Sequence, residues 1–208
     1  MFLVTQLATD ATVYKLTSFD HITLSAASLI FPLTYLIADI TAEVYGYRMA
    51  KKLIWIGTIS NIGFSLLVSS LLKLHSPLSW HLAIAYHEVY NRLTFRSIVH
   101  ALLVPFSYFV DIYLLSKWKI LLKGKYFCLR SAVSTIIGDI IFSVLMVMIT
   151  WWKSDINAPI VELAIATSAV KFIWALLGAY PAMLIVSLIK TSENVDVYDY
   201  YTNFNPFR

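Results

Sequence analysis

Charged residues are scarce in this chain, and cysteine is almost absent. Lys, Arg, Asp and Glu make up 13% of the 208 residues, whereas a typical soluble domain carries about 25%. Hydrophobic residues make up 59%, and the mean hydropathy is +0.73. The scarcity of charge excludes an ordinary soluble domain. The single cysteine, Cys128, excludes an intrachain disulfide.

What the chain does have is long apolar blocks, which predict an all-α membrane protein. A helix needs about 20 apolar residues to cross the hydrocarbon core. Five blocks reach or approach that length, at residues 21–45, 53–72, 96–116, 131–152 and 162–189. The apolar start, residues 1–7, is either a short segment of its own or the end of a further helix. We therefore expect a bundle of about six transmembrane helices.

Basic residues gather in alternate connections between these blocks. They follow the first block and precede the fourth, at Arg48, Lys51, Lys52, Lys117, Lys119, Lys123, Lys125 and Arg130. The positive-inside rule places these connections in the cytoplasm and residues 154–159 outside. Residues 1–190 then form one transmembrane domain. Residues 191–208 form a cytoplasmic tail, which we expect to be poorly ordered because it is polar.

Ionisable residues interrupt the apolar blocks. Each costs about 2.5–3.5 kcal/mol within a span, so it usually faces the interior of a bundle. Asp39, Asp111 and Asp139 lie six to nine residues from a cytoplasmic base, which is about 9–13 Å of helix. We expect these carboxylates to line a pathway together with Lys171 and the polar Asn61. Asp111 as a helix-end ion pair and Lys171 as a snorkelling residue are the alternatives.

The connection 75–92 contains three histidines, His75, His81 and His87, among aromatic residues. Metal ligands on one helical face would lie three or four residues apart, whereas these are six apart. Aromatic rings favour the membrane interface. We therefore expect an interfacial loop here, and neither a metal site nor another cofactor.

The stretch FPLTYLIADITAEVYGYRMAKKLIW, residues 31–55, closely resembles the signature of the queuosine precursor transporter family, also called the vitamin uptake transporter family. The matching residues are Phe31, Pro32, Thr34, Asp39, Glu43, Tyr45, Gly46, Tyr47, Lys51 and Lys52. Later blocks agree, namely SYFVDIYLLSKWK, LRSAVSTIIGDIIFSVL and AVKFIWALLGAYPAMLI. Two positions depart from the family pattern. This chain has Ser107 near a common glutamine, and Ser131-Ala132 where the family commonly has asparagine.

The resemblance implies uptake of 7-deazaguanine compounds for tRNA queuosine across the bacterial inner membrane. The candidates are 7-cyano-7-deazaguanine, 7-aminomethyl-7-deazaguanine and queuine. Asp39 would face the pathway, while its cytoplasmic end would be formed by Glu43, Tyr45, Gly46 and Tyr47. A planar base would stack on an aromatic ring, and the candidates are Trp174, Phe31 and Tyr35. Coupling to protons through a buried aspartate is a further expectation.

Two other functions compete with this one. A substrate-capture subunit of an energised vitamin transporter would also be a small bundle of about six helices. An intramembrane enzyme would need a nucleophile or a metal motif, and the sequence has no His-Glu-x-x-His. We therefore expect a transporter, not an enzyme, that contacts a small molecule and the lipid bilayer but no nucleic acid. Oligomeric state and coupling ion stay open.

Overall fold

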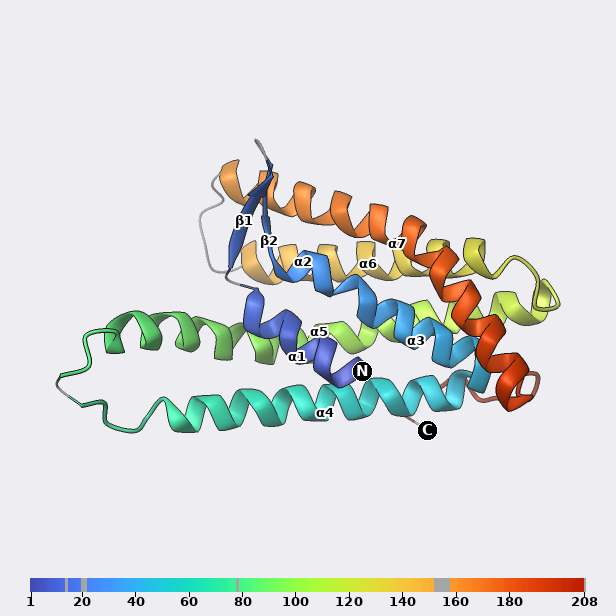
Figure 1. Cartoon of the computed structure of the whole chain (residues 1–208), viewed down its shortest axis with the longest axis horizontal. Coiled ribbons are helices and arrows are strands. Elements are labelled where there is room, and N and C mark those ends of the chain that lie inside the picture. The colour runs from blue at the N-terminus through green and yellow to red at the C-terminus, as the bar shows by residue number, and fades with distance from the viewer. Residues whose placement is uncertain (14, 20–21, 78, 152–157, 208) are drawn as a thin grey trace.

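The chain folds into a bundle of long helices with one small β-hairpin (Figure 1). The computed structural model describes residues 1–13, 15–19, 22–77, 79–151 and 158–207. The helices in these ranges are α1 (Phe2–Thr12), α2 (Ala27–Ile30), α3 (Pro32–Tyr45), α4 (Tyr47–Leu71), α5 (Ala83–Leu121), α6 (Phe127–Trp151) and α7 (Ala158–Glu193). Strands β1 (Leu16–Phe19) and β2 (Ile22–Ser25) pair antiparallel, with Leu16 opposite Ser25.

Four helical segments in the described ranges are long and apolar enough to cross a membrane. They are Ala27–Tyr45, Tyr47–Leu71, Ser97–Leu121 and Ile165–Glu193. These segments overlap four of the five apolar blocks and confirm an all-α membrane protein. The fifth block, 131–152, lies on α6, and most side chains at its far end fall outside the described residues. A span there stays a prediction, as does the outer connection 154–159, most of which also falls outside them.

Two boundaries differ from the sequence-based prediction. The first block was expected to be helical from His21, but the first spanning helical segment begins at Ala27, after β2. The sequence of β2, ITLS, starts with two β-branched residues, which favour a strand. The connection 75–92 was expected to be a loop, yet α5 begins at Ala83. The candidate spanning segment found on α5 is Ser97–Leu121.

The predicted cytoplasmic bases share one end of the bundle. In Figure 1 the α3–α4 junction, the α5–α6 turn and the last turns of α7 all lie at the right, whereas the connection after α4 lies at the left. We call the end of the bundle that holds the α3–α4 junction, the α5–α6 turn and the last turns of α7 the basic end. The arrangement agrees with the alternation of charged connections in the sequence. Which side of a membrane the basic end faces stays a prediction.

Small residues allow the helices to approach each other closely. A Cβ added at Gly138 of α6 would lie 3.0 Å from the backbone oxygen of Ser107 on α5. One added at Gly178 of α7 would lie 2.6 Å from Leu36 Cδ1 on α3. The close contacts bring the polar faces of α3, α5, α6 and α7 together.

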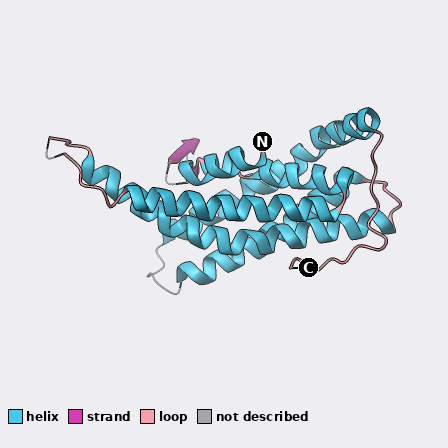
Figure 2. Cartoon of the chain, turned by 90° about the horizontal axis from the view of Figure 1, so that it is seen from below, coloured by secondary structure: helices cyan, strands magenta, loops and turns pink. Residues whose placement is uncertain are grey.

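Gly46 separates α3 from α4. Its φ of +82° lies in the left-handed region, which glycine adopts without strain. A Cβ there would also lie 2.9 Å from Val197 Cγ1 and 3.2 Å from Asp199 Oδ1. Both contacts come from the tail after α7, which crosses the end of the bundle in Figure 2. The turn therefore needs glycine for its conformation and for its space.

Candidate functional site

One face of α3 carries the centre of the candidate site. Tyr35, Asp39 and Glu43 on α3, and Phe31 directly before it, recur every four residues, so they lie on one side of the helix. Each is at most 3% exposed. Successive members are about 6 Å apart along the axis. They define four layers of a polar column that runs through the bundle, and the Glu43 layer is the one at the basic end.

Glu43 is held by three basic side chains from three helices. Its carboxylate accepts hydrogen bonds from Arg130 Nη1 at 2.9 Å and from Lys190 Nζ at 2.8 Å. Lys119 Nζ lies 3.9 Å from the carboxylate and donates to the backbone oxygen of Glu43 at 2.5 Å. Asp196 of the tail binds Lys119 and Lys190 at 2.6 and 2.9 Å. This network ties α3, α5, α6 and α7 together at the basic end.

The tail, residues 194–207, docks against the predicted cytoplasmic motif. The backbone amide of Tyr47, at the start of α4, donates to Asp199 Oδ2 at 2.8 Å. The Tyr47 hydroxyl donates to the Phe204 oxygen at 2.9 Å, and Trp55 Nε1 donates to the Pro206 oxygen at 2.9 Å. Composition alone suggested poor order because it does not reveal such contacts. The sequence offered one signal for this docking, because the tail carries Asp196 and Asp199, whose charge is opposite to that of the bases predicted on the same side.

Asp196 lies outside the spanning segments, and its environment shifts its titration. Partial burial alone would raise the pKa of its carboxyl, but hydrogen bonds and charges from Lys119 and Lys190 outweigh that effect and lower the pKa. The carboxylate is therefore the favoured form, which keeps the tail bound to the two lysines at neutral pH.

The Asp39 layer differs from the Glu43 layer in its partners. Asp39 Oδ2 accepts hydrogen bonds from the hydroxyls of Ser131 and Thr135, the latter at 3.3 Å. Asp111 lies beside it, close enough for the two carboxyls to interact. Both are fully buried. Among the described residues, Asp39 Oδ1 and both Asp111 oxygens have no hydrogen-bond partner of normal geometry. No ion pair to either carboxyl is found among these described residues.

Two tyrosines form the next layer. The Tyr35 hydroxyl bonds to Ser107, and the Tyr108 hydroxyl bonds to Thr34. Ser107 Oγ in turn donates to the Gly138 oxygen at 2.6 Å. Ser107 thus joins α3, α5 and α6 with a short side chain.

The fourth layer, at Phe31, combines an ion pair with aromatic rings, and we call it the Lys171 layer. Lys171 Nζ lies 3.0 Å from Asp139 Oδ1, and the lysine is only 7% exposed. The same ammonium lies 4.7 Å from the Phe31 ring centre and 4.8 Å from that of Phe142. Such positions favour a cation. Lys171 is therefore buried and paired, so the snorkelling alternative is wrong.

His100 and Asn61 extend this layer. The His100 ring packs against Phe31 and Phe142, with centres 5.6 and 5.7 Å away. Its Nδ1 lies 3.2 Å from Asp10 Oδ1 on α1 and 3.5 Å from Asn61 Nδ2 on α4. His100 and Asp10 were not predicted as site residues. The signal for His100 was its spacing, because it lies about three turns before Asp111 on the same helix face.

The remaining candidates lie elsewhere. Trp174 is half-buried on α7 and, among the described residues, does not join the ring cluster around Phe31. Tyr45 donates to Glu193 at 2.6 Å near the surface of the basic end. The structure thus brings Asp39 and Asp111 together. It also groups Asp139, Lys171 and Phe31, and His100 links this group to Asn61.

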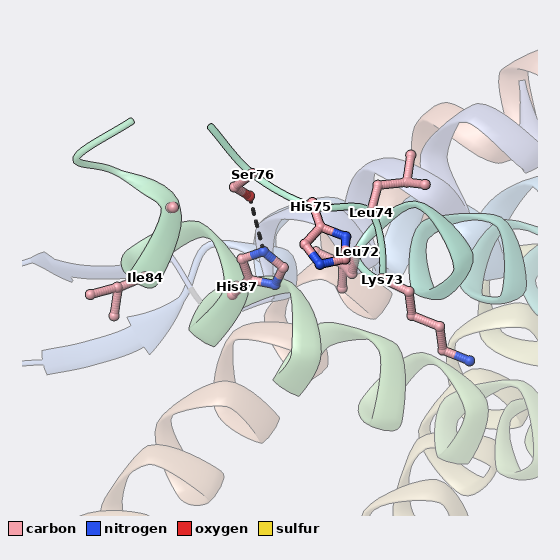
Figure 3. Close-up of a pocket in the computed structure, with 8 residues that line it drawn as sticks. Leu72, Lys73, Leu74, His75, Ser76, Ile84 and His87 are labelled. Atoms are coloured by element: carbon pink, nitrogen blue, oxygen red, sulfur yellow. Dashed lines mark hydrogen bonds between the residues drawn. The ribbon is translucent and has the colours of Figure 1, made fainter. Parts of the chain in front are cut away.

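The opposite end of the bundle holds a surface pocket of about 530 Å³ (Figure 3). His75 and His87 both line it, and Ser76 Oγ lies 3.4 Å from His87 Nε2. In the described part of the chain, no group of three or more His, Cys, Asp or Glu side chains is placed to hold a metal ion. The residues that line the pocket belong to the connection between α4 and α5 and its flanking turns, and this connection lies at the end of the bundle opposite the basic end (Figure 1).

Residues 25–186 of the chain match the protein family described as "Putative vitamin uptake transporter". The matched range contains the α3 members of all four layers and also Asp111, Asp139 and Lys171. No curated protein and no solved structure matches the chain.

Proposed function

Since the chain belongs to the vitamin uptake transporter family, we propose that it imports a queuosine precursor across the bacterial inner membrane. The substrate would be 7-cyano-7-deazaguanine, 7-aminomethyl-7-deazaguanine or queuine. The protein would act as a carrier by alternating access and would carry out no chemical conversion. The family relationship supports transport of a small molecule, and the chemistry of the polar column supports the choice of substrate.

The Lys171 layer is the observation that carries this proposal. A deazaguanine presents neighbouring N–H donors beside a carbonyl oxygen on one edge of a planar ring. The carboxylate of Asp139 can accept a pair of N–H bonds, and the Lys171 ammonium can donate to the carbonyl. The rings of Phe31 and Phe142 beside the ion pair offer apolar faces for the base. A few placed polar groups between aromatic walls are typical of small-molecule sites.

The Glu43 layer supports the carrier mechanism. Alternating access requires that one end of the pathway close while the other opens. The ion pairs of Glu43 with Arg130 and Lys190, together with the docked tail, close the basic end. We propose that these contacts break when the substrate is released to the cytoplasm, in a rigid-body movement of helices.

The test is uptake by bacteria that cannot make queuosine and that lack other transporters for its precursors. We expect cells that express this chain alone to regain queuosine in tRNA when one of the three bases is supplied. The two other bases then compete according to their affinity. Recovery only with an added ATPase partner would favour the substrate-capture alternative. No recovery with any of the three bases, from protein that reaches the membrane, would overturn the proposed substrate.

A further inference from the structure

The buried carboxylates of the polar column differ in whether a cation accompanies them. Glu43 contacts Arg130 and Lys190, and Asp139 contacts Lys171. Asp39 and Asp111 have each other and hydroxyl groups as neighbours. In the ranges that the structure describes, three of their four carboxyl oxygens are buried without a hydrogen-bond partner. Basic partners therefore lie one layer away, at Glu43, and two layers away, at Lys171, but within the described ranges none contacts this pair.

Physical chemistry limits the charge that such a pair can hold. Two neighbouring carboxylates that are both buried and have no basic side chain beside them cannot readily both be ionised, because burial and mutual repulsion act in the same direction. The hydroxyls of Ser131 and Thr135 donate to Asp39 but leave the other oxygens unsatisfied. One proton on the pair removes a negative charge and supplies a donor for a neighbouring oxygen.

We infer that the Asp39–Asp111 pair is a proton-binding site separate from the substrate layer, and that the protein couples import to proton symport. The inference rests on the proposed function for its substrate but not for the proton site itself. In each cycle a proton from the outer side would bind one carboxylate oxygen and later leave to cytoplasmic water. The only bond that forms and breaks is O–H, so charge and atoms balance without a further reactant.

The groups that face the pair are accounted for element by element. On α3 the nearest carboxylate is Glu43, which is balanced by its basic partners. On α6 it is Asp139, which is balanced by Lys171 of α7. The hydroxyls of Tyr35 and Tyr108 bond to Ser107 and Thr34. On α4, residues 53–71 contain no charged residue. On α1, Asp10 faces His100 in the Lys171 layer. None of these groups offers the pair a fixed counter-charge.

The proton site explains how transport could be coupled. When neither carboxyl is protonated, enclosing the pair away from water is electrostatically unfavourable. Closure, and therefore alternation, is then favoured only after a proton has bound. Asp39 and Phe31 are eight residues apart, or about 12 Å along α3, so proton and substrate can occupy the pathway together.

The first test uses infrared spectroscopy of the purified full chain in lipid and needs no substrate. We expect the wild type to show the carbonyl band of a protonated carboxyl at neutral pH. The double variant Asp39→Asn with Asp111→Asn should lose it. The matched variant Asp139→Asn should keep it, because Asp139 is paired with a lysine. A wild type without the band, or a band that survives in the double variant, would overturn the proton site.

The second test uses proteoliposomes, a labelled deazaguanine and an imposed proton gradient. The wild type should accumulate the base against its gradient, and Asp111→Asn should lose that accumulation. Accumulation that follows a sodium gradient and ignores pH would overturn the coupling. If no deazaguanine is transported at all, the proposed function fails, whereas the infrared result still decides whether the proton site exists.

Discussion

Asp39 and Glu43 are the same kind of group, four residues apart on one helix, yet they have opposite surroundings. Glu43 has three cations around it, and Asp39 has hydroxyls and a second carboxyl. A buried charge with partners holds helices together, whereas one without partners destabilises the fold and is usually kept for function. We therefore assign Glu43 to holding the basic end closed and Asp39 to the proposed proton site.

This difference predicts opposite effects of removing each charge. Glu43→Gln leaves Arg130, Lys119 and Lys190 with less negative charge, and we expect it to destabilise the protein by about 3–5 kcal/mol. Asp39→Asn removes a carboxyl that has no basic partner. We expect this variant to unfold at or above the unfolding temperature of the wild type and to lose most uptake. Thermal unfolding in detergent and uptake in cells measure the two quantities. Equal destabilisation by both variants would contradict the division of roles.

Lys171 predicts a strict requirement for an ammonium group. A planar guanidinium cannot replace a compact cation between Asp139 and the rings of Phe31 and Phe142. We expect Lys171→Arg to lower uptake at least about tenfold, or about 1.4 kcal/mol in transition-state terms. Lys73→Arg, at an exposed lysine, is the control and should transport normally. Normal uptake by Lys171→Arg would remove Lys171 from the site.

At the scale of elements, sequence spacing predicted which faces point inward but could not predict which residues meet. The depth of Asp39, Asp111 and Asp139 in their blocks favoured carboxylates that face the interior of the bundle, but it did not show which of them lie together. The sequence alone does not identify the partner of Lys171, because pairing depends on the relative height and rotation of two helices. The same limit hid the cations of Glu43, which come from three different helices.

Glycines at helix contacts give a prediction for the packing of elements. Gly138→Ala places a Cβ 3.0 Å from the Ser107 backbone oxygen, and we expect a loss of stability of about 1–3 kcal/mol from overpacking. Gly63 on α4 has no atom within 4 Å of an added Cβ. Gly63→Ala should therefore be neutral or stabilise the helix by up to about 1 kcal/mol. Unfolding temperatures of the two variants should move apart, and a neutral Gly138→Ala would show that α5 and α6 can separate.

At the scale of the whole molecule, the docked tail should respond to pH. The pKa of Asp196 is lowered in the docked state, so docking is fully favourable above the ordinary carboxyl pKa and weakens as the pH falls through the lowered value. The Val197 amide donates to the Val44 oxygen at 3.1 Å in the docked tail. We expect its hydrogen exchange, divided by the intrinsic exchange rate at each pH, to become faster as the pH falls. In Asp196→Asn that pH dependence should disappear. A response that the variant retains would assign it to another group.

Orientation can be tested with thiol labelling in a Cys128→Ser background. We predict that a cysteine at Lys125 is protected from an impermeant reagent in intact cells and that one at Ser79 reacts. Both positions are exposed, one at the basic end and one in the connection after α4. The reverse pattern would place the basic end outside.

Because α3 and the residue directly before it, Phe31, contribute one residue to every layer, the layers share a common rotational phase. An alanine inserted after Tyr35 would leave Phe31 and Tyr35 in place but turn Asp39 and Glu43 by about 100° about the helix axis. The proton site and the ion pairs of Glu43 would then be lost together, while the rings beside Lys171 would remain. A single short helix thus fixes the relative rotation of two parts of the column, the Phe31 and Tyr35 layers and the Asp39 and Glu43 layers. The number of residues in this helix therefore matters as much as its composition.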